Sequence, residues 1–416
     1  MKARALRVGP QLGRWLEANG VDAGWYAAQA AAFAEAPRFV RLSALPPLIW
    51  PRPGPEAGLA AAAAAAREAR ARSRAFLAAN GGRRLQGGAE EPQEQQHALA
   101  PEEVWSVPQS RTLSQHVGYR CGVMQGVDLA SVAAVEALGC EPGMSVLDLC
   151  CAPGAKLGLL ADRLRRSGCL VGADSSASRL DVCAGLARRL RWAAPQPTSA
   201  PGDWRFALLL ADGADQRHSL EAAAVRWNTA MDGVAFRECA AGAGEADPLQ
   251  LAAPARPRAG RPRVRARLAR DTHFPAAFHR VLVDAQCTTD ASFRHVLRHY
   301  GDEQVWTETT IEALFQQWMD EREGLQAVQR GLIRRGFGAL APGGKMLYAT
   351  CSFAPAQNEE IVQWLLAHEP AAKLLPLPPP CAIKRRRDSP RLPLSAYMDP
   401  ITSASSGLFM ALVQKA

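Results

Sequence analysis

The sequence predicts a doubly wound α/β fold with a mostly parallel sheet. Short apolar runs alternate with segments of helical periodicity. In the first such pair of the main series, a turn of small residues lies between the apolar run and the helical segment. Polar residues also stand at the ends of several apolar runs. Alternating strands and helices are typical of parallel sheets whose two faces are covered by helices. The hydrophobic fraction of 48% is sufficient for an ordinary globular core in a chain of 416 residues.

The main series is predicted to begin with residues 146–156, which read VLDLCCAPGAK. Its apolar run is broken by one acid and then turns into small residues, after which the helix-like segment LGLLADRLRR follows. We interpret this pattern as a strand–loop–helix unit. Such a unit presents backbone N–H groups at the carboxyl end of its strand, where open α/β sheets bind nucleotide-like ligands.

Further strands and helices are predicted from the same two patterns. Apolar runs predict strands at 169–173, 206–211, 279–283, 345–349 and 408–413. Periodic segments predict helices at 157–166, 177–192 and 357–368, with a helix-rich stretch at 311–340. Asp128 is a candidate N-cap for a helix that starts at Leu129.

Composition divides the chain into three segments. These are a small N-terminal accessory region at 1–50, an Ala/Gly/Gln-rich linker at 51–100 and a large domain at 101–416. The Ala-rich part of the linker could form a helix, whereas 81–97 has the composition of a linker. The alternating segment 37–42 predicts a strand in the accessory region. A low-complexity insertion is expected within the large domain at about 216–274.

The net charge of +9 favours a polyanionic partner, but the charge is unevenly distributed. Residues 251–270 alone hold seven arginines and no acid. This stretch is equally well interpreted as an RNA-binding arm or as a solvated insert.

The ten cysteines form no CxxC pair and no cluster with zinc-ligand spacing. No secretory signal is recognised, so a reducing intracellular compartment and no bound metal are expected. No apolar run approaches the ~20 residues that span a bilayer, so no membrane segment is predicted.

Four successive predicted strands end in a carboxylate or a cysteine, at Asp174, Asp212, Asp284 and Cys351. One such residue is usually a cap or a turn former, but four at the same sheet edge favour a ligand site. Asp174 is placed to accept hydrogen bonds from ribose hydroxyls, and Asp212 from an adenine amino group. The first loop lacks GxGxxG and GxxxxGK[ST], which disfavours a dinucleotide or an ATP γ-phosphate. S-adenosylmethionine, with ribose and adenine but no phosphate, fits better.

Cys287 and Cys351 follow neighbouring predicted strands. An inert buried thiol is the simplest interpretation of either residue. A nucleophile instead needs access and a nearby positive charge or helix N-terminus, which Lys156 and the helix at 357–368 could supply. Asp284 lies three residues before Cys287. An acid beside a thiol suits attack on a base ring whose edge the carboxyl group holds.

Several of these motifs together resemble the Sun/nucleolar-protein family of RNA cytosine-C5 methyltransferases (Sun/RsmB/RsmF-like). DLCCAPGAK is similar to the first family motif, VLVDAQC to the fourth, and APGGKMLYATCSFAPAQNEEIV to the sixth. PRFVRL and GLFMALVQK are similar to family segments near the two ends. The resemblance implies a Rossmann-like class I methyltransferase fold with a seven-stranded sheet and a small N-terminal accessory region.

The resemblance also implies S-adenosyl-L-methionine as the cofactor and RNA, either tRNA or rRNA, as the partner. A monomer is expected, in the cytoplasm or the nucleus or nucleolus, with an organelle left open. The implied cofactor-binding residues are Cys150, Cys151, Ala152, Pro153, Gly154, Ala155, Lys156, Asp174, Arg179, Asp212 and Asp284. The implied catalytic residues are Cys351 as the nucleophile, Cys287 as the cysteine that releases the product, and Asp284 and Lys156 at the target base.

The chemistry implied by the resemblance uses both thiols. Addition of the Cys351 thiolate to cytosine C6 makes the ring an enamine, whose C5 can attack a sulfonium methyl group. Asp284 would hydrogen-bond the N3/N4 edge of the base. Cys287 as a thiolate would assist loss of the C5 proton and departure of Cys351. The target base must be single-stranded or flipped out of its stack.

The fourth motif departs from the family pattern. Gln286 stands where the family usually has proline, and Thr288 and Thr289 stand where it has Ser-Gly. Because proline fixes the backbone, this loop is expected to be looser or differently shaped. Two alternatives stay open. The first is a DNA cytosine-C5 methyltransferase, which Gln286 and the TCS sequence at 350–352 disfavour. The second is a non-catalytic RNA-binding or ribosome-assembly factor, which only the altered loop supports.

Overall fold

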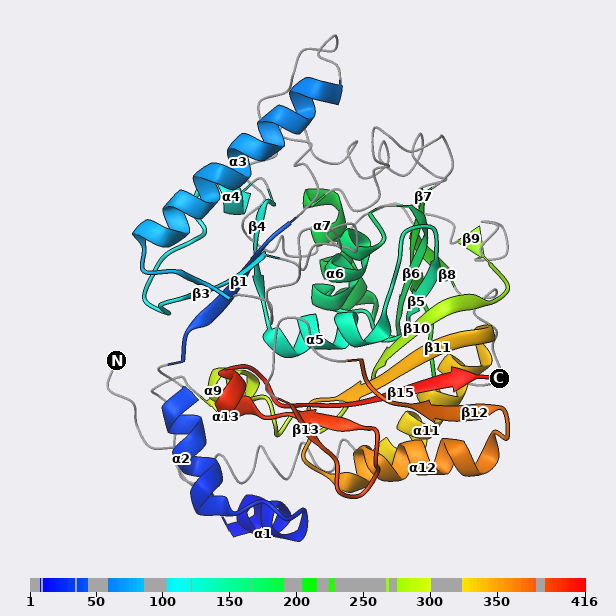
Figure 1. Ribbon diagram of the computed structural model, residues 1–416. Coiled ribbons are helices and arrows are strands. Elements are labelled where there is room, and N and C mark those ends of the chain that lie inside the picture. The colour runs from blue at the N-terminus through cyan, green and yellow to red at the C-terminus, as the bar shows by residue number, and fades with distance from the viewer. Residues whose placement is uncertain are drawn as a thin grey trace, which may run out of the picture.

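The computed structural model contains a large and a small β-sheet, with helices packed against both (Figure 1). It describes residues 8, 10–33, 36–43, 59–85, 103–120, 122–165, 167–190, 204–214, 224–228, 267–268, 275–300, 324–378 and 386–416. Within these ranges, no helix combines the length and the apolar composition that crossing a membrane requires.

Seven strands of the large sheet lie in the order β7–β6–β5–β10–β11–β15–β12. They are β5 (Ser145–Asp148), β6 (Gly168–Asp174), β7 (Trp204–Leu210), β10 (Phe278–Asp284), β11 (Leu340–Thr350), β12 (Ala372–Leu375) and β15 (Leu408–Lys415). The first five strands in that order pair in parallel, whereas β15 is antiparallel to β11 and β12. The predicted doubly wound, mostly parallel sheet is therefore confirmed.

Four short strands extend the sheet at its two edges. They are β8 (Ala224–Asn228), β9 (Arg267–Leu268), β13 (Arg386–Asp388) and β14 (Ala396–Met398). β8 pairs antiparallel with β7, and β9 pairs antiparallel with β8. The residues of both strands lie within the predicted insertion at 216–274. The rest of that insertion lies outside the described residues, as do residues 311–323 of the predicted helix-rich stretch.

Helices cover both faces of the large sheet (Figure 1). One face packs against α5 (Leu129–Leu138), α6 (Ala155–Arg163) and α7 (Ala177–Arg189), and the other against α11 (Leu325–Gly338) and α12 (Glu359–His368). Neighbouring strand residues point to opposite faces. Accordingly, Val146 of β5 packs in the first layer and Leu147 in the second. Asp128 caps α5 as predicted, accepting a hydrogen bond of 3.0 Å from the Ala130 N–H.

The small sheet is antiparallel, with the strand order β2–β3–β1–β4. Its strands are β1 (Arg38–Leu42), β2 (Arg83–Arg84), β3 (Glu103–Val107) and β4 (Met124–Val127). The strand predicted at 37–42 is thus present as β1. The sheet takes strands from all three of the segments into which composition divided the chain.

The segment 51–100, predicted as a linker, contains the long helix α3 (Leu59–Ala79) as well as β2. Ala69 and Leu77 of α3 are buried together with Val40 and Leu42 of β1. Alanine and arginine are strong helix formers, which explains a helix in a stretch of low complexity. The short helix α4 (Val117–Arg120) packs beside α3.

Two N-terminal helices pack against the part of the chain that follows β10. They are α1 (Pro10–Ala18) and α2 (Ala23–Phe33), and their partner is α9 (Phe293–Tyr300). The Tyr26 ring lies 5.0 Å from the Phe293 ring, measured between centroids. Two short helices complete the described secondary structure, the 3-10 turn η5 (Pro355–Gln357) and α13 (Pro400–Ser403).

Arg41 connects the small sheet to the large one. Its guanidinium forms an ion pair with Asp162 of α6, and the two side chains are only 2% and 5% exposed. Arg41 also donates a hydrogen bond of 2.6 Å to Gln125 Oε1, and Ser43 Oγ donates one of 3.0 Å to Asp162. The buried carboxylate is therefore satisfied from the small sheet.

Replacing Arg41 by alanine would leave Asp162 buried without its cation. We expect the free energy of unfolding to fall by about 3–5 kcal/mol, the usual cost of breaking a buried ion pair from one side. Urea unfolding followed by tryptophan fluorescence measures this loss. Arg72→Ala, which removes the exposed partner of Glu68, is the matched control and is expected to leave the unfolding curve unchanged. Equal curves for the two variants would contradict the role given to Arg41.

Candidate active site

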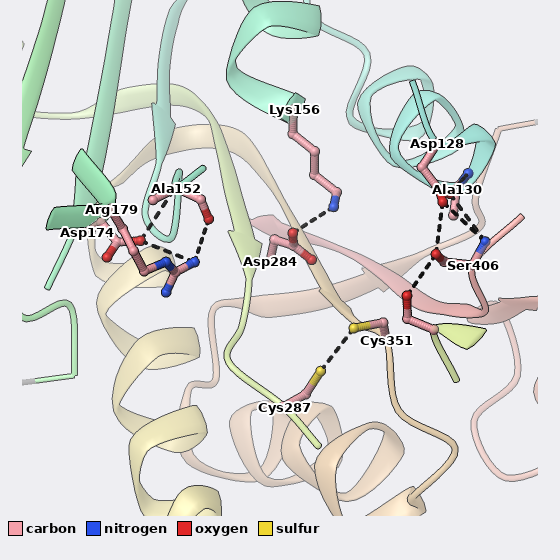
Figure 2. A network of polar contacts seen from close by, with 11 residues as sticks. Asp128, Ala130, Ala152, Lys156, Asp174, Arg179, Asp284, Cys287, Cys351 and Ser406 are labelled. Carbon is pink, nitrogen blue, oxygen red and sulfur yellow. Dashed lines mark hydrogen bonds and ion pairs between the residues drawn. The ribbon is translucent and has the colours of Figure 1, made fainter. Parts of the chain in front are cut away.

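The carboxyl ends of β5, β6, β10 and β11 lie at one edge of the large sheet, because these strands are parallel neighbours. The loop after β5 occupies the middle of this edge. Figure 2 shows Ala152, Asp174 and Arg179 on one side of the edge and Lys156, Asp284 and the two cysteines beside them. The sheet therefore brings most of the predicted site residues into one region.

The loop at 149–154 is held by backbone hydrogen bonds to both neighbouring strands. The Leu149 N–H donates to Leu282 O at 2.9 Å, and the Cys151 N–H donates to Ala173 O at 2.9 Å. A Cβ at Gly172 would lie 2.9 Å from Cys151 Sγ, so glycine there permits the close approach of loop and strand. Gly154 has φ 106°, a value that disfavours other residues. α6 then starts without a side-chain cap, which leaves its first N–H groups available to a ligand.

Asp174, at the end of β6, is 4% exposed and organises the other side of this loop. Its carboxylate accepts hydrogen bonds from the Ala152 N–H at 3.3 Å and the Ser176 N–H at 2.9 Å. Arg179 lies 3.7 Å from the same carboxylate and donates to Ala152 O (Figure 2). A carboxylate has about four lone-pair sites, so Asp174 can still accept bonds from ligand hydroxyls.

Lys156 and Asp284 connect the loop after β5 with the end of β10. Lys156 Nζ lies 2.6 Å from Asp284 Oδ2, and the side chains are 14% and 29% exposed (Figure 2). Burial by itself lowers the pKa of Lys156, but the carboxylate of Asp284 outweighs it and the pKa is raised overall. The site therefore holds a fixed positive charge beside an accessible acceptor.

The Sγ atoms of Cys287 and Cys351 are 3.3 Å apart (Figure 2). Cys351 is partly exposed, whereas Cys287 is buried, so Cys351 is the more accessible thiol. The hydrogen bond with Cys287, followed by burial, raises the pKa of Cys351 well above its usual value, while Lys156 opposes this rise. A proton acceptor is thus needed when Cys351 attacks. All seven cysteines within the described residues are free thiols.

A second set of contacts holds the segment that contains Cys351. Thr350 Oγ1 donates to Asn358 Oδ1, and Asn358 Nδ2 donates to Ser352 O at 2.9 Å. Glu359 is 2% exposed and accepts hydrogen bonds from Tyr397 and Ser389. These contacts give a physical reason for the spacing between the TCS sequence and the later Asn-Glu pair.

Asp148 is a site residue that the sequence analysis did not select. It is 1% exposed at the end of β5, and neither carboxyl oxygen has a hydrogen-bond partner among the described residues. Burial, with a further contribution from the charge of Asp284, raises the pKa of Asp148 to about 8. The sequence feature that could have identified Asp148 is its position as the one acidic residue in the apolar run 146–149.

Asp212 differs from the other predicted site residues. It is exposed after β7, and its carboxylate accepts a hydrogen bond of 2.9 Å from the Ala214 N–H. This is the contact of a turn former, although the carboxylate keeps free acceptor sites. Within the described residues, no group of three His, Cys, Asp or Glu side chains could hold a metal ion.

The altered fourth-motif loop has a defined conformation. Thr289 has φ 53°, in the left-handed region that glycine adopts without strain. Thr289 stands where the family usually has glycine, and its backbone has a conformation that glycine favours. Gln329 Nε2 donates to Gln286 O at 2.8 Å, so a side-chain contact holds the position where the family has proline.

The sheet order and the helices on its two faces are those of the class I methyltransferase fold. A solved structure described as a methyltransferase homolog protein from Pyrococcus horikoshii has the same fold. Its TM-score is 0.53 at 18% identity, and the match covers 98% of this chain and 100% of that one. Residues 264–414 match the family described as 16S rRNA methyltransferase RsmB/F, so the chain is similar to that family over this region. The predicted resemblance is thus confirmed.

Two curated relatives show what the chain is similar to. It is 31% identical over 241 residues to a 5-cytosine rRNA methyltransferase NSUN4 of Bos taurus, covering 57% of this chain and 43% of the relative. It is 32% identical over 103 residues to a mitochondrial tRNA (cytosine(34)-C(5))-methyltransferase of Danio rerio, covering 25% of this chain and 24% of the relative. The matches therefore span less than half the length of either relative.

Asp148 provides a test of the site's electrostatics. Its folded-state pKa of about 8 exceeds the ordinary value of 3.8, so the folded protein holds a proton that the unfolded chain releases between these values. Stability is therefore lost as the pH rises from about 4 to about 8, by about 1.4 kcal/mol for each unit of pKa difference traversed. We expect Asp148→Asn to remove this part of the pH dependence. The measurement is the free energy of unfolding at pH 5 and pH 9, in the wild type and in Asp148→Asn. An equal change between the two pH values in both proteins would contradict the raised pKa of Asp148.

Proposed function

We propose that this protein is an S-adenosylmethionine-dependent RNA cytosine-C5 methyltransferase that acts on tRNA or rRNA through a covalent cysteine–C6 adduct. The observation that carries the proposal is the pair of thiols 3.3 Å apart, at the same sheet edge as the Lys156–Asp284 pair. Both relatives described above are named for cytosine methylation, one in rRNA and one in tRNA, which supports the substrate class.

The residues around the loop after β5 fit S-adenosylmethionine. Asp174 has acceptor sites left for ribose hydroxyls, and the uncapped start of α6 has free N–H groups. Asp148 offers a buried carboxyl group without a hydrogen-bond partner, and a cationic group of the ligand would favour its ionised form. We assign residues 150–156, with Asp174, Arg179, Asp212 and Asp284, to this binding site. When bound, the cofactor supplies the methyl group.

Cys351 is the residue that we assign as the nucleophile. It is the more accessible of the two thiols, and Lys156 favours its thiolate form. Because Cys351 is partly exposed, its proton can pass to solvent. The Sγ anion then forms a bond with cytosine C6, and one electron pair of the C5–C6 double bond moves to C5, which becomes nucleophilic. Asp284 is exposed enough to receive the N3/N4 edge of the base, and its contact with Lys156 holds the carboxylate in place.

Cys287 is assigned to the release of the product. Because its Sγ atom lies 3.3 Å from Cys351 Sγ, it also lies close to the ring carbons next to the covalent bond. Removal of the C5 proton by Cys287 returns the electron pair to the C5–C6 bond, and the bond between C6 and Cys351 breaks. Cys351 leaves as a thiolate and the methylated base is released.

The free thiols are suited to a reducing compartment, where the cysteine pair stays unbridged. The name of the Danio rerio relative places that protein in mitochondria, so we keep both the cytoplasm and an organelle as candidate locations. Base-resolution mapping of 5-methylcytosine in RNA from cells with and without the protein distinguishes tRNA from rRNA as the substrate.

Replacing Cys351 by alanine tests the proposed reaction. We expect transfer of a labelled methyl group to total cellular RNA to be lost, because no bond to C6 can form. Binding of S-adenosylmethionine, measured by calorimetry, is expected to be unchanged. Cys140→Ala is the control, since Cys140 is a buried cysteine outside this edge of the sheet.

Replacing Cys287 by alanine is expected to give the opposite signature. The adduct forms but is not resolved, so labelled methyl groups accumulate in a protein–RNA conjugate that survives a denaturing gel. Wild-type turnover by Cys351→Ala would contradict the proposed mechanism. Absence of methyl transfer by the wild-type protein would instead favour a non-catalytic RNA-binding factor.

A further inference from the structure

Both cysteines lie beyond the last hydrogen bonds that join β10 to β11. The register of the two strands ends with Asp284 opposite Ala349, and one further bond of 2.9 Å runs from the Ala285 N–H to Ala349 O. The sheet by itself therefore does not determine how far Cys287 stands from Cys351.

Buried side chains continue the connection past the thiols. Thr288, Asp290 and Ser352 are each about 1% exposed or less. Thr288 Oγ1 lies 2.9 Å from Ser352 Oγ and donates to Asp290 Oδ1, while the Phe353 N–H donates to Asp290 Oδ2 at 2.7 Å. We call Thr288, Asp290, Ser352 and Gln357 the cysteine latch, because they join the residues that follow one cysteine to those that follow the other.

One assignment of the latch hydrogen atoms satisfies every contact that Thr288 makes. Gln357 Nε2 donates to Thr288 Oγ1 at 2.8 Å, and Gln357 Oε1 accepts from the Thr288 N–H at 3.0 Å. Ser352 Oγ already accepts from the Ala354 N–H at 3.0 Å and gives its hydrogen to Thr288. Thr288 Oγ1 then has both lone pairs occupied, and its one hydrogen must go to Asp290. Asp290 must therefore present an acceptor to Thr288 and another to Phe353.

The two cysteine segments are not held equally. The Cys351 side has its own contacts, from Thr350 and Ser352 to Asn358, which do not involve the latch. The Cys287 side lacks the proline that the similar family usually has, and outside the latch Gln329 donates one hydrogen bond to Gln286 O. A backbone bond of 3.1 Å from the Ala291 N–H to Cys351 O also joins the two segments, four residues after Cys287. Weakening the latch should therefore displace Cys287 more than Cys351.

Asp290 is also the point at which the N-terminal helices contact this region. Tyr26 OH of α2 donates to Asp290 O at 2.7 Å, and the Tyr26 ring packs near Phe293 and Phe353. Phe353 directly follows Ser352 of the latch. The N-terminal helices thus support the segments that follow both cysteines.

We infer that Asp290 is a positioning residue that acts through Thr288 to hold Cys287 against Cys351, and so determines the rate of product release. The inference rests on the proposed function. An asparagine at 290 would turn one acceptor into an N–H donor and leave the hydrogen of Thr288 or Phe353 without an acceptor. Loss of this buried hydrogen bond is expected to slow product release about tenfold.

The test compares Asp290→Asn and Thr288→Val with the wild type, using labelled S-adenosylmethionine and total cellular RNA. We expect methyl transfer per enzyme to fall about tenfold while the covalent protein–RNA conjugate increases, as in Cys287→Ala. Thr288→Ser keeps the hydroxyl group and is expected to behave like the wild type. Glu141→Gln, at an exposed turn before β5, is the control for loss of one negative charge.

A merely structural role would give a different result, because partly unfolded protein lowers turnover and conjugate together. Such a parallel loss, or wild-type turnover in both Asp290→Asn and Thr288→Val, would overturn the inference. In the Cys287→Ala background, Asp290→Asn is expected to add nothing to the conjugate, since both changes act on the same step. The proposed function fails if Cys287→Ala gives no conjugate and the wild type transfers no methyl group. The inference alone fails if Cys287→Ala gives the conjugate but Asp290→Asn and Thr288→Val do not.

Discussion

The ion pair between Lys156 and Asp284 joins the two halves of the candidate site. Lys156 stands at the start of α6, beside the loop that fits the cofactor, and Asp284 ends β10, three residues before Cys287. At 2.6 Å, the pair joins the loop after β5 to the end of β10. Removal of either partner would leave a poorly solvated charge in the middle of the site, so the loop and the carboxylate depend on one another.

The environment of the two thiols divides their roles. The hydrogen bond with Cys287 and burial raise the pKa of the accessible Cys351, and Lys156 offsets only part of this rise. Cys287 is enclosed, and its position depends on contacts made after the sheet has ended. Addition to the base therefore depends mainly on elements near the loop after β5. Release depends on the latch around Asp290, which also contacts the N-terminal helices through Tyr26. The accessory region is thereby connected to the chemistry.

Much of the site follows from patterns that are local in the sequence. Apolar periodicity predicts the strands, and parallel pairing places Asp174, Asp284 and Cys351 at one edge. Contacts between residues far apart in the chain were not predictable, since no local pattern marks the Asp290–Phe353 bond or the unpartnered state of Asp148. The sequence left the helix α3 open, because alanine-rich sequence is typical of both helices and low-complexity segments.

The most direct test of the account is to locate the covalent bond. RNA that carries 5-fluorocytosine cannot lose a proton from C5, so an adduct with it persists and can be digested and mapped by mass spectrometry. If Cys351 is the nucleophile, we expect the modified nucleotide to be attached to the peptide that contains Cys351, in the wild type and in Cys287→Ala. Attachment at Cys287, or methyl transfer without any conjugate, would contradict the assignment of Cys351 as the nucleophile.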